Sequence, residues 1–297
     1  MVYLALQRKK HFPNLCMHSQ FSEHLLPLLQ KITTESEWVW LQSISHMDTK
    51  ELMTAFVKAP RFLSKTLIQF PSKSEILIPS TPGFQVKNWD LVRLSRVWFL
   101  SHFVSLPKDE FVKTIETLFD TAELNELIAL YSALPLLPYP NLWLARATDA
   151  VRSNMGSVFD AIAISNPYPF HHFPELAWNQ LVLKTIFNEK PISLIYGLGN
   201  RRNQELSLSI IDYAKERWAA SRMVQFQVWY LVSPFLRTED LSLVEKLLKS
   251  KHEEEVIAAS LLLFESNHNE AKDLLRKYPK YEIEIQKGNL NWSNLYV

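Results

Sequence analysis

Apolar side chains recur every three to four positions along most of this chain of 297 residues. Such spacing places them on one face of a helix, so the pattern predicts an amphipathic α-helical protein. In the N-terminal part it predicts helices over residues 20–30, 34–45, 49–58 and 88–104. We expect Asp48 to cap the third of these helices and Pro60 to end it.

The same pattern predicts helix–turn–helix pairs over residues 109–138 and 239–268, and a short helix that Pro279 closes. Antiparallel pairs of this kind bury their apolar faces when they stack on their neighbours. The predicted fold class is therefore all-α, with stacked antiparallel helical hairpins in an irregular HEAT-like α-solenoid and little or no β structure.

The organisation that this pattern favours is one elongated domain over residues 1–297. Its parts are N-terminal helices over 1–69, a connector over 70–88, a motif-rich core over 138–235 and C-terminal HEAT-like helices over 238–279. The connector contains three prolines and one glycine, a composition typical of a long loop. Whether it forms a lid or wraps the surface stays open.

The composition excludes several classes of protein. The chain has five glycines, whereas average usage of about 7% would give roughly twenty, so Rossmann, P-loop and β-sandwich folds are disfavoured. A formal net charge of +1 gives nucleic-acid binding no electrostatic support. Cys16 is the sole cysteine, which excludes an intrachain disulfide and a Cys-based zinc site and favours a reducing, cytoplasmic location.

Membrane insertion also has little support in the sequence. The N-terminus begins with apolar residues and continues with basic ones, the reverse of a signal peptide. The longest apolar run is interrupted by Arg93, Arg96 and His102. We therefore expect a buried core helix there and no membrane span.

The most polar part of the core begins after a long amphipathic helix predicted over residues 141–165. Pro167 and Pro169 must end that helix, and Pro174 suits the first position of the next one. Within the long helix, Asp149 and Arg152 have the spacing of an ordinary solvated ion pair.

The helix that follows Pro174 is apolar almost all round, which predicts that it is buried. Gln180 and Lys184 form a narrow polar strip on it, and Asn179 lies on a face that is otherwise apolar. These groups either tie down loop carbonyls or line a pocket in which Lys184 meets an anion. The adjacent His171 and His172 have no further ligand at metal-binding spacing, so we expect no metal and no cofactor.

A second polar cluster surrounds the next predicted helix. Arg201, Arg202 and Asn203 precede it, and Asp212 and Glu216 stand one turn apart on it. Paired carboxylates can perform general acid–base catalysis, which makes these two the catalytic candidates. An ion-pair network with the neighbouring basic residues needs the same side chains, so both interpretations stay open.

Three motifs carry a family resemblance: "NPYP" at 166–169, "AWNQLVLK" at 177–184 and "DYAKERWAASR" at 212–222, with "GLGNRRNQEL" between the last two. With their surroundings, from Pro138 to Phe235, they resemble the EboA family, a bacterial and algal group encoded in "ebo" gene clusters. The resemblance implies a cytoplasmic accessory role in a secondary-metabolite pathway whose precursor is delivered to the periplasm. The molecular activity of the family is not assigned by it.

The resemblance also implies a set of family-motif positions, and the polar and aromatic ones among them are our candidates for a ligand-binding site. They are Arg152, Asn166, Tyr168, Trp178, Asn179, Gln180, Lys184, Arg201, Asn203, Arg217, Trp218 and Arg222. The chain departs from the family pattern at Asp149–Ala150 and at His171–His172, so no special role is implied for those residues.

Three hypotheses follow. The preferred one is an accessory protein that binds a small anionic or prenylated pathway intermediate in a basic, aromatic pocket. The second is a non-catalytic α-solenoid scaffold that holds other proteins of the ebo cluster. The third is an acid–base enzyme that uses Asp212 or Glu216.

Overall fold

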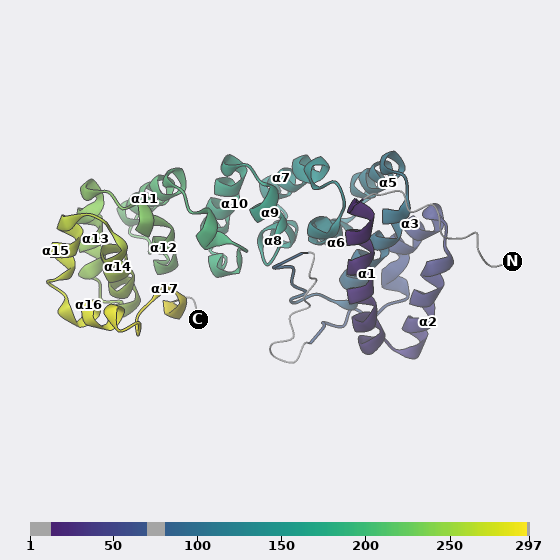
Figure 1. Cartoon of the computed structure of the whole chain (residues 1–297), viewed down its shortest axis with the longest axis horizontal. Helices are drawn as coiled ribbons and strands as arrows, with labels where there is room; N and C mark the ends of the chain where they lie inside the picture. The colour runs from purple at the N-terminus through teal and green to yellow at the C-terminus, as the bar shows by residue number, and fades with distance from the viewer. Residues whose placement is uncertain (1–12, 70–80, 296–297) are drawn as a thin grey trace. The chain divides into compact units, whose positions relative to one another are not determined.

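A computed structural model describes residues 13–69 and 81–295 of the chain (Figure 1). Within these residues the secondary structure is entirely helical, which confirms the predicted all-α class. The only β-type pairing in the described part is an isolated bridge between Leu67 and Asp90. Residues 70–80 of the predicted connector lie outside the described part, so its role as a lid stays a prediction.

The chain divides into two compact units, Met1–Phe173 and Pro174–Val297, and each is described here by itself. The first unit contains α1 (Pro13–Ile32), α2 (Glu35–Ser43), α3 (Thr49–Lys58), α4 (Leu91–Leu100), α5 (Lys108–Thr121), α6 (Leu124–Ala133), α7 (Leu144–Arg152), α8 (Gly156–Ala163) and α9 (Tyr168–His172). The second contains α10 (Glu175–Phe187), α11 (Gln204–Ala219), α12 (Trp229–Val232), α13 (Leu241–Leu248), α14 (Glu253–Glu265), α15 (Asn269–Leu275), α16 (Pro279–Gln286) and α17 (Trp292–Leu295). Short 3-10 turns join many of them.

Helix α3 follows the prediction residue by residue. The Asp48 carboxylate accepts a hydrogen bond from the Glu51 N–H at 2.9 Å, and the Glu51 carboxylate accepts one from the Asp48 N–H at 2.9 Å. This reciprocal capping box satisfies two main-chain donors at the start of the helix. The helix ends at Lys58, two residues before Pro60.

The helix predicted over 88–104 is shorter than expected. Asn88 has a left-handed backbone with φ of 57°, and the capping residue of α4 is Asp90, whose carboxylate accepts a hydrogen bond from Arg93 N–H at 2.7 Å. Beyond Leu100 the chain tightens into a 3-10 segment, Ser101–Ser105. The apolar pattern continues through both segments, which is why periodicity alone does not separate them.

The prediction of one long helix over residues 141–165 is wrong. A 3-10 turn over Pro140–Trp143 comes first, α7 ends at Arg152, and α8 begins at Gly156. Between the two helices the Ser153 hydroxyl accepts a hydrogen bond from the Met155 N–H at 3.1 Å. Such local side-chain to main-chain bonds compete with helix continuation, and a serine followed by Asn154 and Gly156 favours the break.

A buried ion pair holds α3, α4 and α6 together in the first unit. The Arg96 side chain is 3% exposed and donates to the Glu126 carboxylate at 3.0 Å. Its remaining N–H groups donate to the carbonyl oxygens of Phe56 at 2.9 Å and Val57 at 3.3 Å, at the end of α3. The Glu126 carboxylate also accepts a hydrogen bond from the Glu123 N–H at 3.1 Å, at the start of α6. Each buried charge is therefore matched by partners from a different helix.

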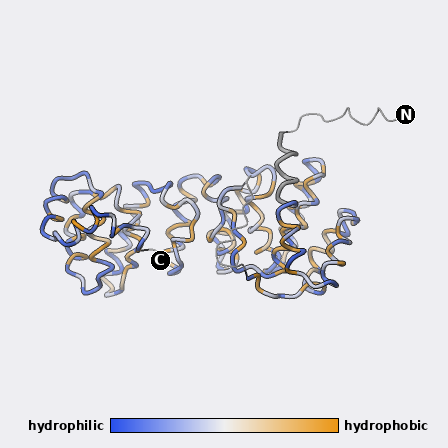
Figure 2. Tube along the Cα trace, turned by 60° about the horizontal axis from the view of Figure 1, so that its bottom comes forward, coloured by the Kyte–Doolittle hydropathy of each residue, from blue (hydrophilic) through white to orange (hydrophobic). Residues whose placement is uncertain are grey.

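The second unit has its core around α14, which contacts α12, α13, α15, α16 and α17. Along the helices of both units, hydrophobic and hydrophilic positions alternate as the periodicity predicts (Figure 2). The expectation that α10 is buried all round is partly wrong, because Leu176 is 73% exposed and Phe187 is 57% exposed. Both lie in the end turns of that helix.

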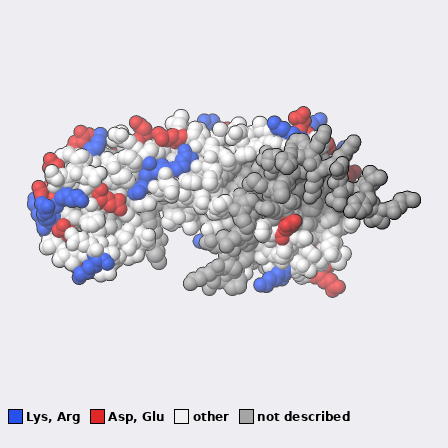
Figure 3. Space-filling view, in the orientation of Figure 1, with Lys and Arg blue, Asp and Glu red and all other residues white. Residues whose placement is uncertain are grey.

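Two features of the molecular surface bear on binding partners. No helix in the described part of the chain combines the length and the apolar character needed to cross a bilayer. On the face shown in Figure 3, basic and acidic side chains occur side by side. Selective attraction of an anion on that face therefore needs a local basic cluster.

We predict that replacing Arg96 by Met lowers the free energy of unfolding by about 3–5 kcal/mol, because Glu126 is left as an uncompensated buried charge. Urea denaturation followed by circular dichroism measures this loss. The matched control is Arg152→Met, which removes an exposed arginine and should cost less than about 0.5 kcal/mol. Equal losses for the two variants would contradict the assignment.

Candidate functional site

Asn166 and Tyr168, at the "NPYP" turn of the first unit, serve as internal ties. The Asn166 amide donates to the carbonyl oxygens of Tyr131 at 3.0 Å and Ala161 at 2.8 Å, and its oxygen accepts the Tyr168 N–H at 3.0 Å. The Tyr168 hydroxyl donates to the Pro140 carbonyl at 2.6 Å, and burial raises the pKa of this phenol. Both side chains are buried, which favours the structural alternative for them.

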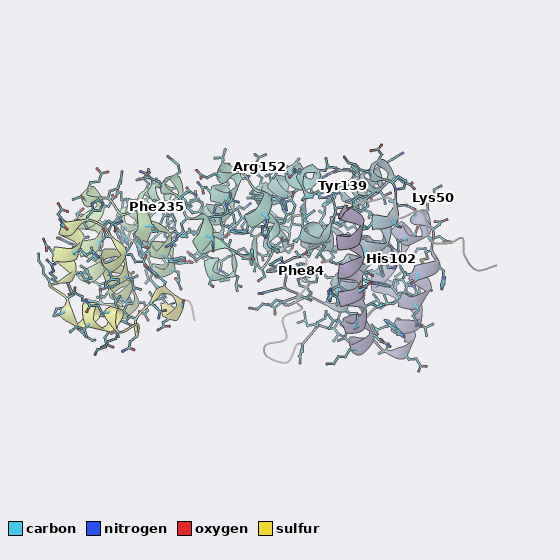
Figure 4. All side chains as sticks on the ribbon, viewed as in Figure 1. Lys50, Phe84, His102, Tyr139, Arg152 and Phe235 are labelled. Atoms are coloured by element: carbon cyan, nitrogen blue, oxygen red, sulfur yellow. The ribbon has the colours of Figure 1, made fainter. Side chains whose placement is uncertain are left out.

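Arg152 lies apart from these ties, on the solvent side of α7 (Figure 4). Its side chain is 69% exposed, and its guanidinium is 3.8 Å from the Asp149 carboxylate. This is the solvated ion pair that the spacing predicted.

His171 and His172 lie in the short helix α9, which precedes the helix that begins after Pro174. Their ring centroids are 6.1 Å apart, and the His172 ring packs 4.8 Å from the Tyr168 ring. Burial lowers the pKa of both imidazoles, so they favour the neutral form near pH 7. Within residues 13–69 and 81–295, no three metal-ligating His, Cys, Asp or Glu side chains cluster together.

In the second unit, Trp178 and Arg201 form a tight pair between α10 and the turn before α11. The indole N–H of Trp178 donates to the Arg201 carbonyl at 3.1 Å, and the Arg201 guanidinium lies 4.8 Å from the centroid of the Trp178 ring. Trp178 is fully buried. Burial lowers the pKa of Arg201, and the nearby Glu175 opposes that shift.

Asn179 and Asn203 bind each other through both of their amide groups. Asn179 donates to the Asn203 oxygen at 3.1 Å, and Asn203 donates to the Asn179 oxygen at 2.8 Å. The same Asn203 oxygen accepts the Leu206 N–H at 2.9 Å and so caps α11. One part-buried pair of amides therefore joins α10 to the first turn of α11.

The predicted polar strip on α10 has two different environments. Gln180 is exposed, whereas Lys184 is half-buried and burial lowers the pKa of its ammonium group. Gln180 and Lys184 therefore both reach the surface of α10. Asn179, on the neighbouring face, is instead bonded within the unit.

The "GLG" segment before α11 has a steric role. Gly197 has φ of 70°, a left-handed conformation that glycine adopts at least cost. A β-carbon at Gly199 would collide with the hydroxyl of Tyr230. The Tyr230 ring lies 4.3 Å from the Arg202 guanidinium, which also donates to the Tyr230 carbonyl at 3.1 Å. These glycines therefore permit close packing of the turn.

Helices α10 and α11 run in the same direction, because their contacts move forward together along both of them. Asn179 meets Asn203 near the start, Phe187 meets Tyr213 farther on with ring centroids 5.2 Å apart, and Glu189 meets Arg217 at 3.2 Å. The chain returns between them through residues 188–203. This parallel arrangement differs from the antiparallel hairpins that the sequence predicted, and it brings the two C-terminal ends together.

A groove of about 290 Å³ lies at these C-terminal ends, and we call it the α10–α11 groove. It is lined by Phe187, Tyr213, Glu216, Arg217, Ala220 and Arg222. Three of the candidate residues, Glu216, Arg217 and Arg222, thus come together. Tyr213 lies within the motif over residues 212–222, but neither Tyr213 nor Phe187 was predicted to line a site.

Two other candidate residues of α11, Asp212 and Trp218, lie outside the α10–α11 groove. Asp212 is 73% exposed and pairs with Lys215 at 3.6 Å, one turn along the helix. Trp218 packs against Trp229 with ring centroids 5.8 Å apart, and the Lys246 ammonium lies 4.1 Å from its centroid. Trp218 and Lys246 line a separate hollow of about 540 Å³ beside α13.

Comparison with known protein families decides the affiliation of this chain. The sequence model of the family described as metabolite traffic protein EboA matches residues 21–233, which is more than half of the chain. The chain belongs to the EboA family. The match spans both units and includes every candidate residue, and it ends before α13. No curated protein and no solved structure matches this EboA chain.

We predict that the Asn179 and Asn203 side chains contribute to stability as a coupled pair. Asn179→Ala, Asn203→Ala and the double variant are compared by urea denaturation, and the coupling energy should be about 1 kcal/mol within a usual range of about 0.5–3 kcal/mol. Asn203→Ala should cost about 1 kcal/mol more than Asn179→Ala, because it also removes the cap of α11.

The exposed neighbour Gln180 provides the control, since Gln180→Ala should leave stability within about 0.5 kcal/mol of the wild type. Strictly additive losses for the two asparagine variants would show that their mutual hydrogen bonds do not hold the helices together.

Proposed function

We propose that this EboA chain acts in metabolite traffic in the cytoplasm by binding a small anionic intermediate with an apolar body in the α10–α11 groove. The observation that carries the proposal is the combination of Arg217 and Arg222 with an aromatic pair in one open hollow. Phe187 is 57% exposed there, so its ring is available to an apolar group. A prenylated anion has both of the required features.

The two arginines contribute differently. Arg217 is held in place, because its Nε–H donates to the Met223 carbonyl at 2.9 Å and its terminal nitrogen lies 3.2 Å from Glu189. Arg222 is exposed and has no ion-pair partner in the described part of the chain. Arg222 is therefore the cation with unused capacity to bind a carboxylate or phosphate.

The turn after α11 keeps the two arginines close. The main-chain N–H of Arg222 donates to the Arg217 carbonyl at 2.8 Å, and Ser221 between them adopts φ of 55°. Glu216 lines the same groove and offsets part of the positive charge. A small ligand with a few negative charges suits this balance better than a polyanion.

A second candidate function is a scaffold for other ebo-cluster proteins, with its helices stacked as a HEAT-like solenoid. One observation favours it: the motif side chains Asn166, Tyr168, Trp178, Asn179 and Asn203 already bind partners within their own unit. Such residues support a framework and do not need a ligand. A pure scaffold, however, gives the α10–α11 groove no function.

The acid–base hypothesis has less support than either. A catalytic carboxylate is expected to face a cavity in an environment that perturbs its pKa. Asp212 is on the solvent side of α11, and its nearest cation is Lys215 on the same helix. Glu216 is exposed, although it borders the groove.

We predict that Arg222→Glu weakens binding of geranyl diphosphate at least tenfold in isothermal titration calorimetry, which corresponds to about 1.4 kcal/mol. Inorganic pyrophosphate, which lacks the apolar body, should bind more weakly than geranyl diphosphate. Thermal unfolding should be unchanged, because Arg222 has no ion pair to lose among the described residues.

Lys113→Glu, an identical charge change at an exposed position of α5, is the control and should leave the affinity unchanged. If both variants lose affinity equally, the effect comes from overall charge and the α10–α11 groove is not the site. If the wild type binds neither probe, and cluster proteins co-purify with it, the scaffold is the better account.

A further inference from the structure

A second groove, in the first unit, has the composition of a ligand site and lies on other helices than those of the proposed function. It has a volume of about 360 Å³ and is formed by α2, α3 and the turn after α3. We call it the Trp40–Phe62 groove. Its walls include these two aromatic rings, Met47, Ala55, Lys50 and Lys58.

The aromatic wall is already assembled. The Trp40 and Phe62 rings are stacked with centroids 4.7 Å apart and planes within 8° of parallel. Trp40 also meets the fully buried Phe99 ring edge-on at 5.7 Å, which attaches the stack to the core. Phe62, the outer ring, is 48% exposed. A flat apolar surface is thus presented to solvent without the cost of ordering it.

A buried carboxylate fixes the segment that carries Phe62. Glu37 on α2 accepts the Ser64 N–H at 2.8 Å and the Thr34 N–H at 2.8 Å. Burial alone raises the pKa of Glu37, but the hydrogen bonds from Thr34 and Ser64 outweigh it and hold the pKa below its ordinary value. The ionised carboxylate therefore joins α2 to the chain two residues beyond Phe62.

The charged side chains of this groove favour an anion. Lys50 and Lys58 lie eight residues apart on α3, about 12 Å along its axis, and Figure 4 shows Lys50 at the outer edge of the unit. Neither lysine has an ion-pair partner in the described part of the chain. The acidic Glu51 is engaged by the Asp48 N–H at 2.9 Å in the capping box. The ammonium groups of Lys50 and Lys58 are therefore available to bind an anionic ligand.

We propose that the Trp40–Phe62 groove binds a planar aromatic carboxylate, with its ring system stacked on Phe62 and its carboxylate held by Lys50 or Lys58. Stacking on an exposed, pre-ordered ring supplies affinity for a flat apolar body, and the lysines select a negatively charged one. The site is independent of the α10–α11 groove, so the chain has two distinct places for small anions.

Naphthoate is a suitable probe, and the neutral analogue naphthol reports on the aromatic part alone. Saturation-transfer NMR on the full chain gives the dissociation constants of both compounds. Lys50→Gln combined with Lys58→Gln should weaken naphthoate at least fivefold and leave naphthol within twofold. Phe62→Leu, which keeps an apolar side chain but removes the ring, should weaken both at least fivefold.

Lys113→Gln, at an exposed position of α5 that lines neither groove, serves as the control and should leave naphthoate affinity unchanged. Thermal unfolding of each variant establishes that it is folded. The proposal is overturned if folded wild-type protein does not bind naphthoate. It is also overturned if the lysine double variant or Phe62→Leu binds naphthoate as tightly as the wild type.

Discussion

The side-chain amides of Asn179 and Asn203 set the geometry on which the second unit depends. By binding each other, they fix the start of α10 against the start of α11, and Asn203 also caps α11. Because the two helices then run in the same direction, Phe187 and Tyr213 meet at their far ends. The α10–α11 groove is thus positioned by a polar contact that does not line it.

The motif residues divide into two groups with different structural roles. Asn166, Tyr168 and Trp178 are buried and bind main-chain carbonyls, so they close turns that the prolines and glycines open. Arg217 and Arg222 lie beyond these ties, at the edge of a hollow. Most members of this polar motif therefore build the framework, and the arginines at its edge remain available to a ligand.

Much of the fold could be predicted from the sequence, because helical periodicity and capping are local. Asp48, Glu51 and Lys58 define α3 without help from distant residues. The break after Arg152 was missed, since a serine hydroxyl bonded to the main chain leaves the apolar spacing intact. Periodicity also cannot show that Phe187 emerges from the core, because its exposure depends on which helices cover its turn.

The candidate site was harder to predict than the fold. Asn166 finds its partner carbonyl on Tyr131, 35 residues away, and nothing in the local sequence indicates that distance. Only the fold shows that Asn179 is occupied and that Arg222 is available. A polar motif residue that is bonded within the fold cannot be told from an available one by sequence alone. The partners that the fold supplies decide between the two roles.

Native mass spectrometry of the chain, purified gently from its own host, would show whether the α10–α11 groove holds a small molecule. We expect a small anionic molecule that is retained in the native spectrum, is lost on denaturation and is missing from the Arg222→Glu variant. A clean mass for the wild-type chain, or one that carries only protein partners and is unchanged by Arg222→Glu, would contradict this expectation.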